Sequence, residues 1–259
     1  MWYNDKKFNV ERAQIMMKKL YGKSELWFAL AWIIAYCVLA SAADNLSAEI
    51  GTMKIVTFPV LAVLSAVLYI FVKRNGLSGK YGLCMPQIPA SKMLFYIPLL
   101  VLLTANLWYG AAMNASPAET LLYVLSMFCV GFLEEMIFRG FLFNAMVKDG
   151  VKPAVIVSSV TFGIGHIINL FNGSGAELLP NILQVIYAVA VGFAFVMIYY
   201  RTKSLLPCIA THSLFNGISA FSAEAANTVE NQIVSGILIA VIAGAYAAYI
   251  ALMRNGSSR

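Results

Sequence analysis

Residues 129–143 read CVGFLEEMIFRGFLF, so three ionisable side chains, Glu134, Glu135 and Arg139, interrupt an otherwise apolar run. The run extends over 118–147 and is longer than the roughly 20 residues that a helix needs to span a bilayer. An ionisable side chain at mid-bilayer costs roughly 2.5–3.5 kcal/mol. The three side chains must therefore face a protein or water-filled interior, which requires other helices around them.

The composition of the whole chain leads to the same conclusion. The 259 residues are 61% hydrophobic and 12% charged, whereas an ordinary soluble domain is about half apolar and about a quarter charged. The mean hydropathy is +0.78. A soluble fold of this size cannot bury so much apolar surface, which excludes a cytosolic globular domain, a disordered protein and a nucleic-acid binder. Long apolar runs indicate helices rather than a barrel, so we expect an all-α, polytopic integral membrane protein.

About eight stretches are apolar and long enough to be transmembrane helices. They are expected at 26–43, 50–72, 93–113, 118–147, 151–171, 178–200, 204–221 and 232–253. Together they are expected to form a single membrane-embedded domain, 26–253, with a motif-bearing core at 118–221. Residues 1–25 mix lysines with aromatic and aliphatic residues, which predicts an amphipathic segment in the membrane interface. Residues 254–259 are expected to form a cytoplasmic tail.

Positive charges alternate along the loops. Lysine and arginine occur before the first predicted span, in every second loop and after the last span, whereas the other loops carry mostly Asp and Glu. Because basic loops stay in the cytoplasm, this pattern predicts that both termini are cytoplasmic. The same pattern explains the net charge of +6, because the excess lysines and arginines lie in the loops expected in the cytoplasm, next to anionic lipids of the bilayer. No cleavable signal peptide is visible, and we expect a prokaryotic cytoplasmic membrane, although the endoplasmic reticulum fits the same pattern.

Helix geometry separates the roles of the three intramembrane ionisable residues. Glu135 and Arg139 are four residues apart, share a helix face and are expected to form a structural ion pair. Glu134 is rotated by about 100° from Glu135 and has no arginine on its own face. A carboxylate without a cationic partner in a dry site suits a general acid or base. Glu134 is therefore the candidate for chemistry.

The chain contains only two histidines, and both fall inside predicted spans. His166 follows Phe162 by four residues, and Asn216 follows His212 by four, so each pair shares a helix face. At about 1.5 Å per residue, Glu134 and His166 lie roughly 20 Å from the cytoplasmic ends of their spans. The His212–Asn216 pair lies roughly 12–18 Å from the same side. A membrane histidine can be only a helix–helix hydrogen-bond partner, but these overlapping depths predict one shared cavity, which we expect to open toward the cytoplasm.

Three short motifs occur in order on these spans: Glu134-Glu135-x-x-x-Arg139, Phe162-x-x-x-His166 and His212-x-x-x-Asn216. Together they resemble the signature of the CPBP (Abi) family of intramembrane proteases, which includes the type II CAAX prenyl endopeptidases. The resemblance covers about 118–221 and implies an all-helical membrane fold. It implies hydrolysis of a peptide bond in a membrane-associated peptide or protein, which is a prenylated CAAX-type substrate for part of the family.

The resemblance also implies roles for individual residues. Glu134 and His166 would activate a water, and His212 and Asn216 would stabilise the oxyanion of the tetrahedral intermediate. The supporting residues would be Glu135, Arg139 and Phe162. No cofactor is firmly implied. Zinc is an open alternative, because Glu134, His166 and His212 could supply three ligands, but no HExxH motif is present and we favour water activated without metal.

Other functions fit parts of this pattern. A non-catalytic membrane scaffold or a bacteriocin-immunity protein of the same fold would keep the helices, although the intact motifs argue against it. A transporter could use Glu134 and the histidines as a proton relay, but no inverted repeat is visible. Cys208 precedes His212 by four residues, which a thiol protease could use, but the sequence places no other activating cation beside it. The sequence carries no signature of oligomeric state.

Overall fold

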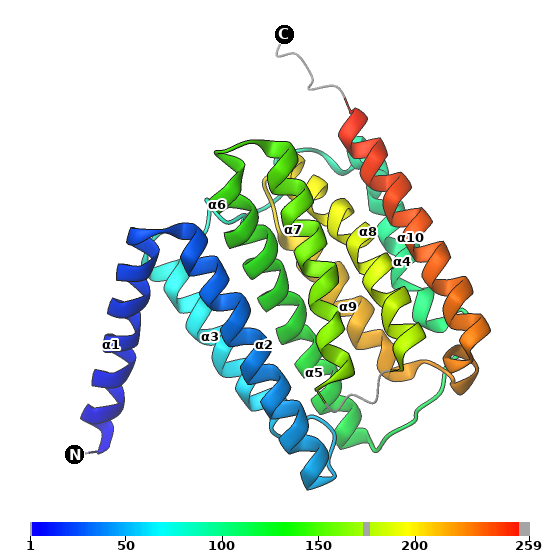
Figure 1. The fold of residues 1–259 in the computed structure, drawn as a ribbon, viewed down its shortest axis with the longest axis horizontal. Coiled ribbons are helices and arrows are strands. Elements are labelled where there is room, and N and C mark those ends of the chain that lie inside the picture. The colour runs from blue at the N-terminus through cyan, green and yellow to red at the C-terminus, as the bar shows by residue number, and fades with distance from the viewer. Residues whose placement is uncertain (1, 173–176, 254–259) are drawn as a thin grey trace.

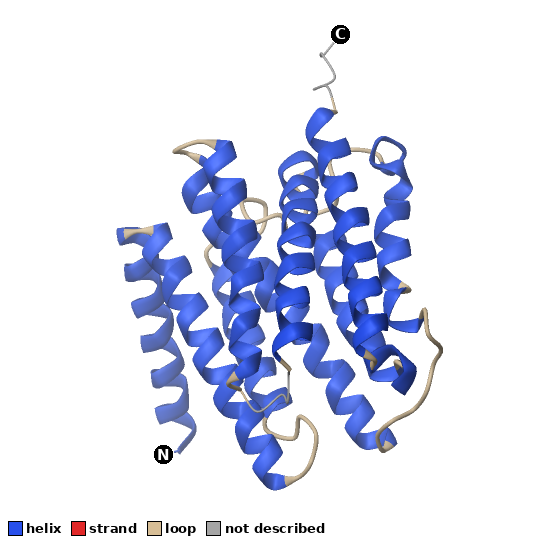
Figure 2. Cartoon of the chain, turned by 45° about the vertical axis from the view of Figure 1, so that its right-hand side comes forward, coloured by secondary structure: helices blue, strands red, loops and turns tan. Residues whose placement is uncertain are grey.

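The computed structural model describes residues 2–172 and 177–253, and every regular element within these ranges is a helix (Figure 1, Figure 2). Side chains are described at residue 12 and from residue 14 onward within the same ranges. The one β-type pairing among the described residues is an isolated bridge between Ala111 and Ser222. The predicted all-α membrane fold is confirmed, whereas the predicted tail at 254–259 lies outside the described residues.

The α-helices are α1 (Trp2–Lys23), α2 (Glu25–Ile50), α3 (Thr57–Arg74), α4 (Ile97–Leu103), α5 (Pro117–Glu134), α6 (Asn144–Val147), α7 (Val151–Gly165), α8 (Leu178–Thr202), α9 (Leu206–Ile218) and α10 (Val229–Leu252). Tighter 3₁₀ segments are η1 (Ala90–Tyr96), η2 (Ala105–Leu107), η4 (His166–Leu170), η5 (Ser219–Phe221) and η6 (Glu224–Asn227). A wider π-helical segment, η3 (Glu135–Phe143), joins α5 to α6.

Within the described part of the chain, seven helical segments are long and apolar enough to cross a membrane. The longest is Pro117–Val147, which combines α5, η3 and α6. The remaining predicted span, 204–221, corresponds to α9 followed by η5, and α9 has 13 residues. At 1.5 Å per residue α9 is about 20 Å long, which is shorter than the hydrocarbon core of a bilayer. It is held by protein neighbours instead, because it packs on α5 and α4.

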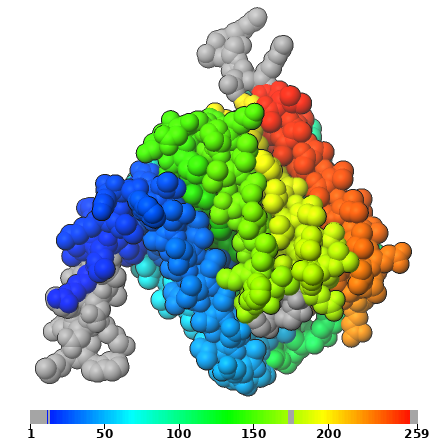
Figure 3. Space-filling view, in the orientation of Figure 1, coloured from blue at the N-terminus to red at the C-terminus, as the bar shows by residue number. Residues whose placement is uncertain are grey.

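The long helices pack side by side as a bundle (Figure 1). α8 packs against both α7 and α10, and α5 packs against both α9 and α3. α1, which covers most of the predicted interfacial segment, runs back along α2 at one edge and is not among the seven apolar segments. Figure 3 shows the face on which α2 (blue), α7 (green), α8 (yellow) and α10 (orange to red) follow one another.

Two glycines allow the close helix contacts that carry the polar residues. A Cβ atom on Gly131 of α5 would lie 2.7 Å from the backbone nitrogen of Ser213 on α9. A Cβ atom on Gly163 of α7 would lie 2.8 Å from the backbone nitrogen of Val189 on α8. Real Cβ atoms do not approach backbone so closely, so only glycine permits these spacings. Glu134 and His212 flank the first contact in sequence, and His166 lies just after the second.

The π-helical segment η3 occupies the middle of the longest span. In π geometry each N–H bonds the carbonyl five residues earlier, so the turn is wider than in an α-helix. All nine residues of η3 are buried. Just beyond it, the side-chain amide of Asn144 donates to the Gly140 carbonyl at 2.7 Å and to the Tyr199 hydroxyl at 2.6 Å. This ties the segment to α8 and places Glu134 and Glu135 at the junction of α and π geometry.

Candidate active site

Glu134 ends α5 and is held by neighbours from two other helices. The hydroxyl of Tyr36 on α2 donates a 2.7 Å hydrogen bond to its Oε1. Nε2 of His212 on α9 lies 3.5 Å from its Oε2. The Glu134 side chain is 13% exposed, and Oε2 has no hydrogen-bond partner among the described residues. One carboxylate oxygen is thus fixed by Tyr36, and the other can still accept a hydrogen bond.

The neighbouring carboxylate belongs to a fully buried ion pair. Oε1 of Glu135 accepts a hydrogen bond from Arg139 at 3.0 Å, and both side chains are 0% exposed. This is the pair that the spacing of four residues predicts. The same Oε1 lies 2.8 Å from Nδ1 of His212. The Arg139 guanidinium lies over the ring of Phe162, 3.9 Å from its centre, in a cation–π contact. These contacts connect Arg139 to Glu134 through a single histidine.

His166 lies where α7 passes into η4. Its Nδ1 faces the carbonyl of Phe162 at 3.1 Å, and its own carbonyl accepts a 2.9 Å hydrogen bond from the side chain of Asn181. The Phe162 ring meets both imidazoles edge to face, with centres 5.1 Å from His166 and 5.8 Å from His212. Phe162 thus contacts both histidines and orients them by packing. Because Nδ1 of His166 is engaged, Nε2 is the ring nitrogen left for a ligand.

Two adjoining cavities bring the candidate residues together. The larger has a volume of about 390 Å³ and is lined by Glu134, His166 and Asn216, together with Tyr36. The smaller has a volume of about 50 Å³ and is lined by His166, His212 and Asn216. The structure therefore gathers all four residues that were predicted to be catalytic. Among the described residues no hydrogen bond joins Glu134 to His166, so a molecule in the cavity would have to bridge them.

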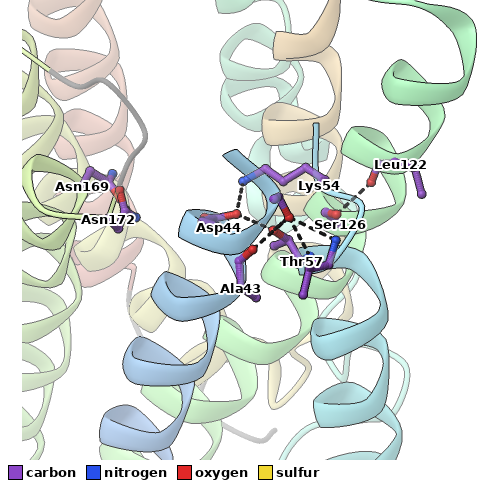
Figure 4. Close-up of polar contacts among 10 residues, drawn as sticks. Ala43, Asp44, Lys54, Thr57, Leu122, Ser126, Asn169 and Asn172 are labelled. Atoms are coloured by element: carbon purple, nitrogen blue, oxygen red, sulfur yellow. Dashed lines mark hydrogen bonds and ion pairs between the residues drawn. The ribbon is translucent and has the colours of Figure 1, made fainter. Parts of the chain in front are cut away.

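The larger cavity extends to the end of the bundle where α2 meets α3. There it is lined by Asp44, Lys54 and Thr57, and both Lys54 and Thr57 donate to Asp44, at 2.8 and 2.6 Å (Figure 4). This end is opposite to the basic loops at 75–92 and 201–203. His166 and Asn216 lie in the halves of their helices that are remote from the basic loops, whereas Glu134 lies just past the middle of Pro117–Val147 on the side of Lys148. The cytoplasmic opening expected from the sequence therefore stays a prediction.

The side chains that could bind zinc do not form a ligand set. Among the described residues, no three His, Cys, Asp or Glu side chains are grouped so that they could hold a metal ion. Glu134 and His212 face each other directly, and Nδ1 of each histidine is directed at a protein oxygen. The set of Glu134, His166 and His212 would have to rearrange to coordinate zinc, and we derive no step through it.

Tyr36 is a site residue that the sequence does not reveal. It lies 98 positions before Glu134, so no local spacing connects the two. Its only signal is a hydroxyl within an apolar span, because a buried tyrosine usually needs a hydrogen-bond partner. The carboxamides of Asn106, Asn169 and Gln184, which also line the larger cavity, have no recognisable spacing either.

Two comparisons with known proteins cover the segment that carries most of these residues. Residues 116–218 match the family described as type II CAAX prenyl endopeptidase Rce1-like. Over 107 residues the chain is 30% identical to "Putative membrane peptidase YdiL" of Bacillus subtilis (strain 168), an alignment that covers 41% of this chain and 38% of that protein. The chain thus aligns with well under half the length of this relative. The matched segment contains all four predicted catalytic residues, whereas Tyr36 lies outside it. The resemblance seen in the sequence is confirmed for residues 116–218, the segment that is similar to the Rce1-like family.

Proposed function

We propose that this chain is an intramembrane endopeptidase that hydrolyses a peptide bond of a membrane-associated substrate. The Rce1-like match and the relative named as a membrane peptidase support a membrane protease. The observation that carries the more specific proposal is the cavity of about 390 Å³, which Glu134, His166 and Asn216 line together. Ionisable and carboxamide groups are costly inside a membrane, and their convergence on one cavity supports a chemical task.

Glu134 and His166 activate the attacking water. A water in the cavity donates one hydrogen to the carboxylate of Glu134 and is held by Nε2 of His166, since both side chains line that cavity. As the water oxygen attacks the carbonyl carbon of the scissile bond, its proton passes to Glu134. Glu134 then delivers that proton to the leaving amine, so the carboxylate is regenerated. The hydrogen bond from Tyr36 keeps the carboxylate aimed at the cavity.

His212 and Asn216 stabilise the oxyanion. Nδ1 of His212 faces Glu135 at 2.8 Å, and its Nε2 faces Glu134 at 3.5 Å beside the cavity. A hydrogen on Nε2 is therefore directed toward the place where the scissile carbonyl would lie. Once Glu134 has taken the proton of the water, the Nε2 hydrogen can be donated to the oxyanion, together with the amide of Asn216.

The substrate is a peptide or protein that reaches the site within the bilayer. The description of the matched family suggests a prenylated CAAX-type C-terminus as the substrate class to test first. The organism of the relative favours a prokaryotic cytoplasmic membrane as the location.

Cleavage by the purified full-length protein in detergent tests the proposal. The probes are quenched fluorescent peptides that end in a CAAX sequence, each prepared with and without a farnesyl group. We expect the wild type to cleave at least one form and Glu134→Gln to be inactive. Glu49→Gln, which changes an exposed carboxylate at the end of α2, is the matched control and should cleave normally. Equal cleavage by Glu134→Gln would refute the mechanism, and a wild type inactive on both forms, also in vesicles, would favour the non-catalytic scaffold.

A further inference from the structure

Gln184 of α8 lies where three cavities meet. Its side chain lines the larger catalytic cavity and the smaller one beside the two histidines. It also lines a third cavity of about 270 Å³, which extends past Asn227 and Gln232 near the start of α10. Asn106 of η2 lines both the larger cavity and the third. These two carboxamides therefore line a path of adjoining cavities that starts beside Glu134.

Hydrogen bonds to the protein fix the orientation of the Gln184 carboxamide. Its Oε1 accepts from the side-chain amides of Asn169 at 3.1 Å and Asn181 at 3.4 Å. Asn172 donates in turn to Asn169, next to it at the end of α7 and η4 (Figure 4). The oxygen of Gln184 is thus occupied, whereas its NH₂ group donates to no protein acceptor among the described residues. The amide end of Gln184 is the end that a ligand in the cavity can use.

Asn106 presents the complementary group. Its NH₂ donates to the carbonyl of Phe215 at 2.7 Å, which leaves its carbonyl oxygen as a hydrogen-bond acceptor for the cavity. Gln184 and Asn106 together offer one donor and one acceptor, and neither carries a charge. A peptide group needs one acceptor for its N–H and one donor for its C=O. Away from water an extended peptide cannot leave these groups unpaired, because each costs several kcal/mol.

We propose that Gln184 and Asn106 bind the backbone of an extended, uncharged peptide segment beside the scissile bond. The proposal rests on the proposed endopeptidase function and names the part of the substrate that this path holds. Tyr187 and Phe215 line all three cavities and give the path apolar walls, which fit aliphatic side chains. Recognition through the backbone selects a segment that is locally unwound, since a helical substrate keeps its own hydrogen bonds.

Binding of a defined peptide to Gln184 variants tests the proposal. The probe is a fluorescently labelled, end-blocked octapeptide of alanine and leucine, and its affinity is measured in detergent with the Glu134→Gln protein, which does not turn it over. Gln184→Glu keeps the acceptor for Asn169 and Asn181 but replaces the donor, and should weaken binding by about tenfold or more. Gln184→Met should weaken it by about fivefold. Gln87→Met, at an exposed loop position, is the control and should bind as before.

A second measurement needs no variant of the protein. Ester analogues of the same peptide, each lacking one backbone N–H, should bind the same protein several-fold more weakly at one position of the series. Uniform binding of the whole ester series, or unchanged binding by both Gln184 variants, would overturn the proposal. If the wild type meanwhile cleaves CAAX peptides in a Glu134-dependent way, the endopeptidase function stands without this subsite. If the wild type does not cleave but peptide binding still depends on Gln184, the catalytic function is rejected and the peptide-binding site is retained.

Discussion

Two polar clusters lie between the helices of this bundle, one where α2 meets α3 and one around Glu134. Both combine carboxylates with cations. In the first cluster, Asp44 accepts from Lys54 and Thr57 (Figure 4), and the Ser47 hydroxyl bonds three backbone groups. None of these side chains has a buried polar atom without a partner. The cluster satisfies itself and joins the ends of two helices.

The second cluster leaves hydrogen bonds unmade. The buried atoms without a hydrogen-bond partner include Oε2 of Glu134, Oε2 of Glu135 and two nitrogens of Arg139. Native proteins pair nearly all buried polar atoms, so a concentration of unpaired ones needs a reason. The two clusters therefore differ: the first pairs its buried polar atoms and holds helices together, whereas the second keeps unpaired polar atoms buried directly behind the cavity that Glu134 lines.

The two clusters should differ most when one polar side chain is replaced in each, because one replacement should affect activity and the other stability. Glu134→Gln should lower kcat/KM by about 10²–10⁴-fold, because it removes the general base. Ser47→Ala should leave cleavage nearly unchanged and lower the free energy of unfolding by about 1–3 kcal/mol, because it leaves buried backbone groups unpaired. Peptide cleavage and thermal unfolding in detergent measure the two effects. A loss of activity in Ser47→Ala equal to that in Glu134→Gln would remove the distinction.

The buried ion pair of Glu135 and Arg139 should contribute more to stability than the cluster where α2 meets α3. Arg139→Met should destabilise the protein by about 3–5 kcal/mol, because it removes the arginine partner of the fully buried Glu135 and leaves only His212 beside that carboxylate. The double variant Glu135→Gln/Arg139→Met should recover part of that loss. Unfolding in detergent measures both. A double variant less stable than the single one would show that the charge imbalance is not the cause.

Tyr36 tests whether the second cluster is tuned for chemistry. Tyr36→Phe should lower kcat by about tenfold and leave KM nearly unchanged, because it removes a hydrogen bond to a charged group worth about 1.5 kcal/mol. Tyr246→Phe, which removes a hydroxyl bonded to the Met93 carbonyl in the other half of the bundle, is the control. An unchanged kcat in Tyr36→Phe would assign Tyr36 to packing alone.

Lys54 should contribute little by comparison. Its ion pair with Asp44 joins two side chains that are each 19% exposed, so solvent screens part of the attraction. Lys54→Met should therefore lower the free energy of unfolding by about 1 kcal/mol. A loss as large as that of Arg139→Met would show that the two ion pairs are energetically alike.

The smallest effect should come from metal removal. Since the described residues offer no set of three metal ligands, a zinc chelator should leave cleavage unchanged. Metal analysis of the purified protein is the accompanying measurement. Stoichiometric zinc, together with chelator inactivation that zinc reverses, would contradict metal-free activation of the water.

Contacts within one helix were predictable from the sequence, and contacts between helices were not. The spacing of Glu135 and Arg139 predicts their ion pair, because four residues make one helical turn. The contacts of Glu134 with Tyr36 and of Glu135 with His212 join positions 98 and 77 residues apart. They depend on how the helices pack, for which a single sequence has no local signal.

The depth estimates for the site residues placed them at overlapping levels, and the structure brings all four beside two adjoining cavities. Depth along single helices does not say toward which side such a cavity opens, because the span Pro117–Val147 is longer than the hydrocarbon core is thick. The π-helical segment and the shortness of α9 also had no signal in the sequence, since apolar runs do not report hydrogen-bond pattern.

The wide turn of η3 constrains how this chain can change its length. A π segment holds one residue more than an α-helix with the same hydrogen-bonded frame. Deleting one residue from 135–143 would therefore let the segment tighten into an ordinary α-helix while the helix beyond it keeps its orientation. The same deletion in the α-helical part of the span, such as 117–134, would rotate everything beyond it by about 100° around the helix axis. A change of chain length is thus absorbed more easily within η3 than elsewhere in this span.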